Sequence, residues 1–293
     1  MRPRNAGSAA FLVFLLILLP AGLARSGSKP VVRFGVIPRY NPLVMFRSYQ
    51  PIMDYLTEST PYRFELKVAR SYDEAVQFLA DRDVELASLG DVTFVEAYRS
   101  FGAVPLVRPL NADGRPYYRS VIIVRKDSPI RDLSDLKGKR VAFGSVHSTS
   151  GNLIPRFFLF RHGVRIEDLA SATNLGKHDI VAKAVLKGEY DAGAVKDVVA
   201  ERYRRHGLRF LARSDPIPSV PIVAHPATDP AVREAVKRAL LAVDPENPVF
   251  QERLSQWDPE FRHGFVEART EDYRPIFGLM DSFEGTCGGR CHR

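Results

Sequence analysis

The stretch Gly144-Ser145-Val146-His147-Ser148-Thr149-Ser150-Gly151 separates two different hydrophobic patterns. The run before it, residues 140–143, is apolar and typical of a buried strand. The run after it, residues 152–160, has the apolar spacing of a helix. The two patterns predict a strand that turns into a helix, with three consecutive hydroxyl residues at the helix start.

Those hydroxyl residues are Ser148, Thr149 and Ser150. The first turn of a helix has backbone N–H groups without an internal partner, and the helix dipole places partial positive charge there. Amides and hydroxyls together form a cluster of neutral donors that suits a small tetrahedral oxyanion such as phosphate, phosphite or a phosphonate. A simpler interpretation is that Ser148 or Ser150 only caps the helix.

Strands alternate with helices on both sides of this stretch. Before it, we expect strands at residues 31–38, 63–69, 84–90, 104–108 and 120–124, and helices at 49–58, 72–80 and 92–98. After it, we expect strands at 191–195 and 208–211, an extended crossover at 216–224 and a helix at 230–243. The alternation predicts an α/β fold with largely parallel sheets. Little pattern is evident after Gly278.

The order of these elements predicts two α/β lobes. Lobe 1 comprises residues 31–122 and 224–280, lobe 2 comprises residues 123–223, and a C-terminal tail follows at 281–293. Two crossings between the lobes would form a hinge, and a cleft between two lobes is a common place for a small-molecule site.

Residues 1–24 have the three parts of a secretory signal peptide: a basic start, a short apolar run and small residues before the cleavage point. The alternative is a transmembrane anchor, for which the apolar run is short. Its removal takes away Arg2 and Arg4 and lowers the formal net charge from +8 to +6. This mild basic excess fits an anionic ligand or simple solubility. A nucleic-acid partner is not expected, because no dense basic stripe with interleaved aromatic residues is present.

The two cysteines, Cys287 and Cys291, lie close to the C-terminus and are followed by His292. In an exported chain they could form a short disulfide. The sequence Cys-Gly-Gly-Arg-Cys-His is also one residue longer than the usual haem c attachment spacing. A disulfide, a free tail and a haem site all stay open, and a cofactor is not expected.

Several segments resemble one known family. They are, in order, Tyr72, residues 84–90, 117–121 and 135–139, Ser148-Thr149-Ser150-Gly151 with Pro155, Lys177-His178-Asp179, residues 188–192 and Ile217-Pro218. Over about residues 31–245 the chain resembles the periplasmic phosphate/phosphite/phosphonate-binding proteins of ABC importers. The resemblance implies the two-lobed type II periplasmic-binding-protein fold, an α/β fold with a hinge and a ligand cleft between the lobes.

The resemblance also implies the ligand-binding residues. The hydroxyls of Ser148, Thr149 and Ser150 would hold the oxyanion, and Tyr72, Tyr118 and His178 would complete the site. Members that bind aminoalkylphosphonates also use two acids for the ligand amine. One of these positions falls near Asp197 and the other near the apolar Val220, which weakens the expectation of an amine-bearing ligand.

Asp91 follows Gly90 at the start of an expected helix. We interpret it as the helix N-cap. The alternative is that its carboxylate faces the cleft and accepts a proton from a protonated oxyanion.

The sequence therefore predicts an exported, periplasmic solute-binding protein that delivers a phosphorus oxyanion to an ABC transporter permease. The alternative is a sensor subunit that signals to a separate membrane kinase or envelope partner. A monomer is expected. An enzyme is not, because the chain has no Gly-x-Ser-x-Gly elbow and no metal-ligand spacing.

Overall fold

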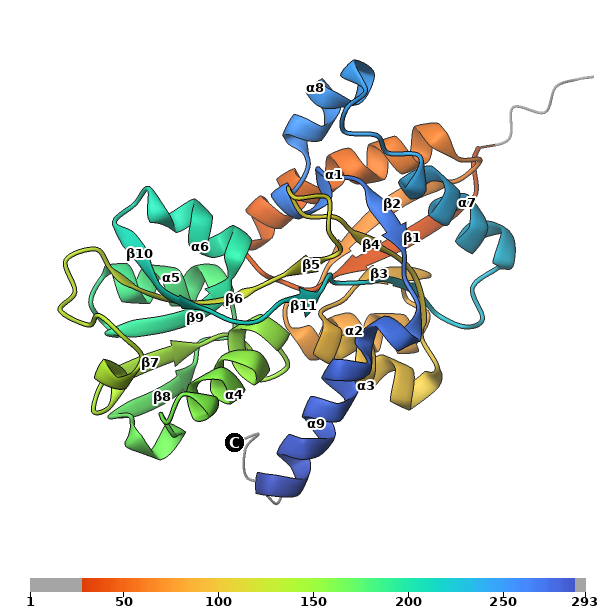
Figure 1. Ribbon diagram of the computed structural model, residues 1–293. Helices are drawn as coiled ribbons and strands as arrows, with labels where there is room; N and C mark the ends of the chain where they lie inside the picture. Colours follow the sequence, from red (N-terminus) through yellow and green to blue (C-terminus); the bar gives the residue numbers. More distant parts are fainter. Residues whose placement is uncertain (1–27, 288–293) are drawn as a thin grey trace, which may run out of the picture.

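The computed structural model describes residues 28–287, with side chains described up to residue 282. The predicted signal peptide lies outside this part of the chain, as do the side chains of Cys287, Cys291 and His292. Figure 1 shows two lobes side by side, each with a central sheet between helices. No helix in the described part combines the length and apolar character needed to cross a bilayer.

The sheet of the first lobe has six strands in the order β13-β4-β12-β3-β1-β2. Its strands are β1 (Val31–Val36), β2 (Arg63–Val68), β3 (Leu86–Ser88), β4 (Val104–Pro109), β12 (Ile222–Ala224) and β13 (Phe265–Glu267). β1 runs parallel to β2 and β3, whereas β12 and β13 are antiparallel to their neighbours.

The sheet of the second lobe has five strands in the order β10-β6-β9-β7-β8. Its strands are β6 (Ser120–Arg125), β7 (Arg140–Phe143), β8 (Ser171–Asn174), β9 (Ala192–Lys196) and β10 (Leu208–Arg213). β7 is parallel to β8 and β9, while β6 is antiparallel to β9 and β10.

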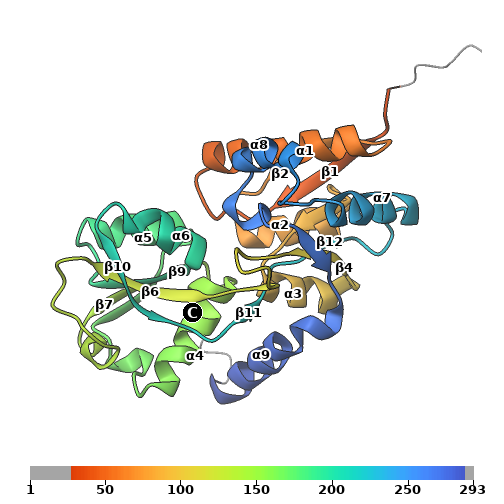
Figure 2. The same ribbon diagram turned by 45° about the horizontal axis from the view of Figure 1, so that its top comes forward.

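Helices cover both faces of each sheet (Figures 1 and 2). In the first lobe they are α1 (Pro42–Ser59), α7 (Pro230–Leu241) and α8 (Pro248–Gln256) on one face, and α2 (Tyr72–Ala80), α3 (Asp91–Phe101) and α9 (Arg274–Cys287) on the other. In the second lobe they are α5 (His178–Leu186) and α6 (Asp197–Arg204) on one face, and α4 (Ile154–Arg161) on the other. Shorter helical turns are η1 (Ser134–Leu136), η2 (Thr149–Leu153), η3 (Ile166–Asp168), η4 (Pro259–Phe261) and η5 (Thr270–Tyr273).

Two short strands link the sheets. β5 (Tyr117–Tyr118) leads into the second lobe, β11 (Ile217–Pro218) leads back, and the two pair antiparallel with Tyr118 opposite Ile217. The lobe boundaries expected from the sequence stay a prediction. We propose that this paired strand is the hinge about which the lobes close.

The expectation of largely parallel sheets is wrong: both sheets are mixed, because β4, β6, β10, β12 and β13 pair antiparallel. Most expected elements are present, with two further differences. α1 begins at Pro42 rather than near residue 49, because Asn41 caps it by accepting a hydrogen bond from Val44 N and proline suits the first helical position. The absence of pattern expected after Gly278 is wrong for the described residues, which continue α9 to Cys287. Met280 on this helix is buried in the core formed with α2 and α3.

The packing of β9 on α5 requires a glycine. A Cβ atom at Gly193 would lie 2.6 Å from Val181 Cγ1 and 3.0 Å from Val185 Cγ2. We expect Gly193→Ala to lower the free energy of unfolding by about 1–3 kcal/mol, because the added methyl overpacks this contact. Chemical denaturation followed by circular dichroism measures the effect.

Gly278→Ala is the matched control, since nothing lies within 4 Å of a Cβ at this helical position. Replacement of a helical glycine by alanine should stabilise the protein by about 0.5–1 kcal/mol. Equal effects of the two substitutions would show that the β9–α5 contact is looser than the structure has it.

Candidate functional site

The Ser148–Gly151 turn is held by a close approach of two glycines. Gly144 N donates to Gly151 O at 2.7 Å, and Ser148 Oγ accepts a hydrogen bond from Gly151 N at 3.0 Å. The turn is a five-residue π-helical segment, η2, before the α-helix proper. Ser148 is therefore its N-cap, as the simpler interpretation of the sequence predicts.

The capping bond leaves the Ser148 hydroxyl proton available. His178 Nδ1 accepts from Lys196 N at 3.2 Å, so the proton of the neutral ring is assigned to Nε2, which donates to Ser148 Oγ at 3.3 Å. Burial, aided by the charges of Arg39 and Lys196, lowers the pKa of His178 to about 3. His178 is thus a neutral donor at physiological pH.

Tyr72, the first residue of α2, continues this chain of hydrogen bonds. Ser148 acts to lower the Tyr72 pKa, and because Ser148 Oγ already accepts from Gly151 N and His178 Nε2, its own proton is directed toward the Tyr72 hydroxyl. Burial raises the pKa of Tyr72 to about 12 and keeps the phenol protonated. The Tyr72 proton has no acceptor among the described residues, so this chain ends in a free donor.

A second chain of hydrogen bonds runs through Thr149. Thr149 Oγ1 accepts from Val92 N at 3.0 Å, which joins the turn to α3 of the first lobe, and its hydroxyl is hydrogen-bonded to Tyr118. Tyr118 in turn donates to Asp91 Oδ2 at 3.0 Å. The interpretation of Asp91 as an N-cap is wrong: Gly90 is the N-cap of α3 and Asp91 is its first helical residue.

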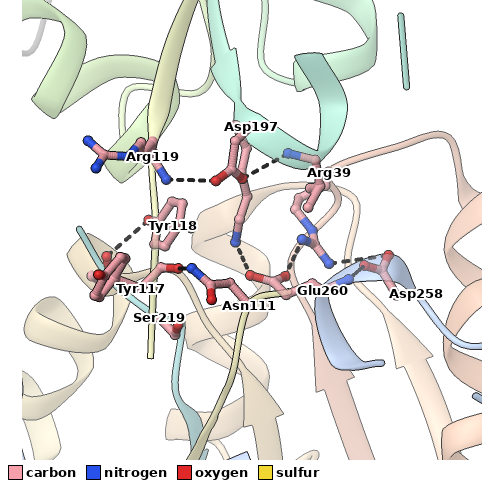
Figure 3. Close-up of polar contacts among 12 residues, drawn as sticks. Arg39, Asn111, Tyr117, Tyr118, Arg119, Asp197, Ser219, Asp258 and Glu260 are labelled. Carbon is pink, nitrogen blue, oxygen red and sulfur yellow. Dashed lines mark hydrogen bonds and ion pairs between the residues drawn. The ribbon is translucent and has the colours of Figure 1, made fainter. Parts of the chain in front are cut away.

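The remaining predicted residues have different surroundings. Ser150 is buried and its carbonyl accepts from Ser120 Oγ at 2.7 Å, whereas its hydroxyl has no partner among the described residues. Asp197 uses both carboxylate oxygens on backbone amides, Arg119 N and Val198 N, each at 2.8 Å. Figure 3 shows Asp197 beside Arg119. The structure therefore joins five predicted residues in one network, and the Asp197 side chain lies outside it.

Four buried charged residues at this site were missed from the sequence: Arg39, Lys196, Asp258 and Glu260. Glu260, in η4, pairs with Arg39 through one oxygen and with Lys196 through the other, and Arg39 also lies 3.4 Å from Asp258 Oδ2 (Figure 3). Burial acts to raise the pKa of Glu260, but the charges of Arg39 and Lys196 outweigh it and hold that pKa below its usual value. Lys196 ends β9 of the second lobe. Glu260 lies between α8 and β13 of the first lobe, so the Lys196–Glu260 pair spans the two lobes.

Two of these residues could have been found from their position in the sequence. Arg39 and Lys196 lie at the carboxyl ends of parallel strands, where ligand sites of open α/β sheets gather. The sequence offered no such indication for Glu260, because it lies on an irregular segment far from Arg39 and Lys196 in the chain. Lys196 Nζ also lies 3.9 Å from the centroid of the Tyr118 ring, which places its charge next to the predicted site.

A cavity of about 1040 Å³ opens between the lobes on the outer side of Lys196 and Glu260. Its lining includes the aromatic rings of Tyr40, Tyr117 and Phe210 and five arginines, together with acids. The arginines are Arg47, Arg202, Arg205, Arg213 and Arg262, and the acids are Asp113, Asp197, Glu201, Asp258 and Glu260. None of these five arginines forms an ion pair within the described part of the chain. No group of three or more metal-ligating side chains occurs there either.

Comparison with known proteins identifies the family and the fold. The family described as "ABC transporter, phosphonate, periplasmic substrate-binding protein" matches residues 34–273. The phosphonates-binding periplasmic protein of Escherichia coli is 26% identical over 275 residues, which cover 88% of this chain and 80% of that protein. The phosphate-import protein PhnD of Mycolicibacterium smegmatis is 28% identical over 250 residues, covering 80% and 78%.

The crystal structure of PhnD1 from Prochlorococcus marinus in complex with methylphosphonate has a similar fold. Its TM-score is 0.78 at 22% identity, covering 88% of this chain and 99% of that one. The two lobes described above are therefore those of a type II periplasmic binding protein.

The contacts of His147 predict that the stability of the protein depends on pH. Its Nδ1 lies 2.8 Å from Glu96 Oε1 and its Nε2 lies 2.8 Å from Asp73 Oδ1, so it joins the second lobe to two acids of the first. The hydrogen bond with Glu96 raises the pKa of His147, and burial only partly opposes it. A raised pKa stabilises the folded form fully below the ordinary histidine pKa, and this contribution is lost as pH rises through the raised value.

We therefore expect His147→Gln to lower the melting temperature most below about pH 6.5 and progressively less above it. Thermal unfolding of both proteins between pH 5 and 9 measures this difference. His162→Gln is the control, because His162 is exposed and its ring nitrogen contacts only Phe158 O. A difference that does not change with pH would exclude a charged His147 in the folded protein.

Proposed function

The chain belongs to the family of periplasmic phosphonate substrate-binding proteins of ABC transporters, and we propose that it captures a phosphorus oxyanion between its two lobes. It is a substrate-binding protein rather than an enzyme. The proposed ligand is phosphate, phosphite or a small phosphonate. The ligand-binding residues are the seryl and threonyl hydroxyls of the η2 turn together with Tyr72, Tyr118 and His178.

One observation carries this proposal: the hydrogen bonds around Ser148 end in the Tyr72 hydroxyl, a donor with no acceptor among the described residues. The neutral His178 directs its proton to Ser148, Ser148 directs its proton to Tyr72, and the Tyr72 proton is left over. A donor that is held in a fixed direction and has no protein acceptor suits an anionic oxygen, which accepts a charge-assisted hydrogen bond. The free hydroxyl of Ser150, on the same turn, supplies a second donor.

The observed contacts favour a ligand without an amine. Each carboxylate oxygen of Asp197 already accepts from a backbone N–H group, and Val220 is a buried apolar residue. An ammonium group would find a carboxylate already held by the backbone at one position and no carboxylate at the other. We therefore propose that aminoethylphosphonate binds more weakly than methylphosphonate.

The proposal extends to transport. The curated relatives are named for phosphonate binding in the periplasm and for phosphate import, so we propose that this chain is exported and delivers its ligand to a membrane permease. The role of a sensor subunit stays a prediction.

Isothermal titration calorimetry of the purified protein with phosphate, phosphite, methylphosphonate, aminoethylphosphonate and sulfate tests the ligand. Tyr72→Phe removes a donor to an anion, and Ser148→Ala removes the hydroxyl that orients this donor, so each should weaken binding roughly ten- to a hundredfold. Ser145→Ala is the control, since the Ser145 hydroxyl accepts only from His147 N. No binding of any phosphorus oxyanion by folded protein would refute the proposed function.

Export makes a separate prediction. We expect protein recovered from the periplasm to lack residues 1–24, because the small residues Gly22 and Ala24 suit signal-peptide cleavage. Intact mass spectrometry measures this. An uncleaved chain held in the membrane fraction would instead indicate an N-terminal anchor.

A further inference from the structure

The carboxylate of Asp91 is only half satisfied. The residue is 0% exposed, and Oδ2 accepts the Tyr118 hydroxyl at 3.0 Å. Oδ1 is buried and has no hydrogen-bond partner in the described part of the chain. Because a buried carboxylate oxygen without a donor is costly, this atom calls for an explanation.

The charged and titratable groups around Asp91 are engaged elsewhere. Arg108 pairs with Asp272 at 2.9 Å, and Lys196 pairs with Glu260. The Tyr273 hydroxyl donates to Ser219 O at 2.8 Å. Apart from Tyr118, no neighbouring side chain therefore donates to Asp91.

Asp91 is connected to the proposed ligand site on both sides. Tyr118 is one hydrogen bond away, and the next residue along the chain, Val92, donates its N–H to Thr149 Oγ1. The two chains of hydrogen bonds at the site thus end differently. One ends in a free donor at Tyr72, and the other ends in a free acceptor at Asp91 Oδ1.

A ligand that satisfies both ends must carry an acceptor oxygen and a hydroxyl. We propose, building on the proposed function, that Asp91 selects oxyanions that retain a proton on oxygen, with the ligand P–OH donating to Asp91 Oδ1. Hydrogenphosphate and the monoanions of phosphite and alkylphosphonates meet this requirement. Sulfate, which has no proton near neutral pH, presents only acceptors to this oxygen and is rejected.

The electrostatics of the residue fit this role. Burial raises the pKa of Asp91 to about 7, while the charge of Lys196 and the Tyr118 hydrogen bond act to lower it and the charge of Glu260 raises it. Phosphate groups lose their second proton near pH 6. Carboxylate and ligand therefore hold a proton with similar strength, so one proton is shared between them around neutral pH.

Asp91→Asn separates this role from a structural one. The asparagine carbonyl oxygen still accepts from Tyr118, but an N–H donor replaces the acceptor at Oδ1. We expect calorimetry at pH 7 to show at least tenfold weaker binding of phosphate and methylphosphonate. Sulfate, which we expect not to bind the wild-type protein detectably, should bind the variant.

Asp179→Asn is the matched control. Asp179 is also a buried acid in the first turn of a helix with one unpartnered oxygen, but its other oxygen lies 3.3 Å from Lys183 Nζ and it takes no part in the network. The ligand selectivity of the Asp179→Asn protein should equal that of the wild type.

The pH dependence of the wild-type protein tests the same inference without a variant. Sulfate binding should strengthen at least tenfold from pH 8 to pH 5, because protonated Asp91 becomes a donor. Wild-type protein that binds a phosphorus oxyanion but binds sulfate equally well at pH 7, or an Asp91→Asn protein with unchanged selectivity, would overturn the role of Asp91 and leave the proposed function intact. Failure to bind any phosphorus oxyanion would instead refute the proposed function.

Discussion

Packing of two lobes over a polar cleft buries charged groups, and a buried charge without an opposite charge is strongly destabilising. The ion pairs of Glu260 meet this constraint most directly, since its carboxylate binds Arg39 of its own lobe and Lys196 of the other. A buried ion pair stabilises little by itself, but loss of one partner costs about 3–5 kcal/mol because a charge is left uncompensated. The lobes can therefore pack in this arrangement only where Lys196 meets Glu260, which fixes their relative position.

The same pairing explains why the site depends on neutral donors. Arg39 and Lys196 are the two buried cations of the described residues, and the carboxylates of Glu260 and Asp258 compensate them. His178 is uncharged because burial lowers its pKa. An oxyanion would therefore meet dipoles held in place by the fold, and its affinity would depend on their fixed directions rather than on net charge.

The sequence predicted those parts of the structure that depend on local pattern. The strand before Gly144, the helix after it and the hydroxyls between them follow from residues close together in the chain, and so does Ser148 as a cap. Glu260 could not be found in this way, because its role arises from contact with residues more than 60 positions away. The hydrogen bond of Asp91 was missed for a related reason, since Asp91 begins α3 and its partner Tyr118 lies on β5, 27 positions away.

Tyr118 connects the proposed selection of a protonated ligand with movement of the lobes. It lies in β5, one of the two strands that pass between the lobes, and pairs there with Ile217 of the returning strand. Its hydroxyl donates to Asp91 of the first lobe, and Lys196 Nζ of the second lobe lies over its ring. A ligand proton on Asp91 Oδ1 would reduce the negative charge that Tyr118 and Lys196 face across the hinge. The residue proposed to recognise the ligand is thus in direct contact with the strand about which the lobes are proposed to turn, so recognition and closure depend on the same hydrogen bond.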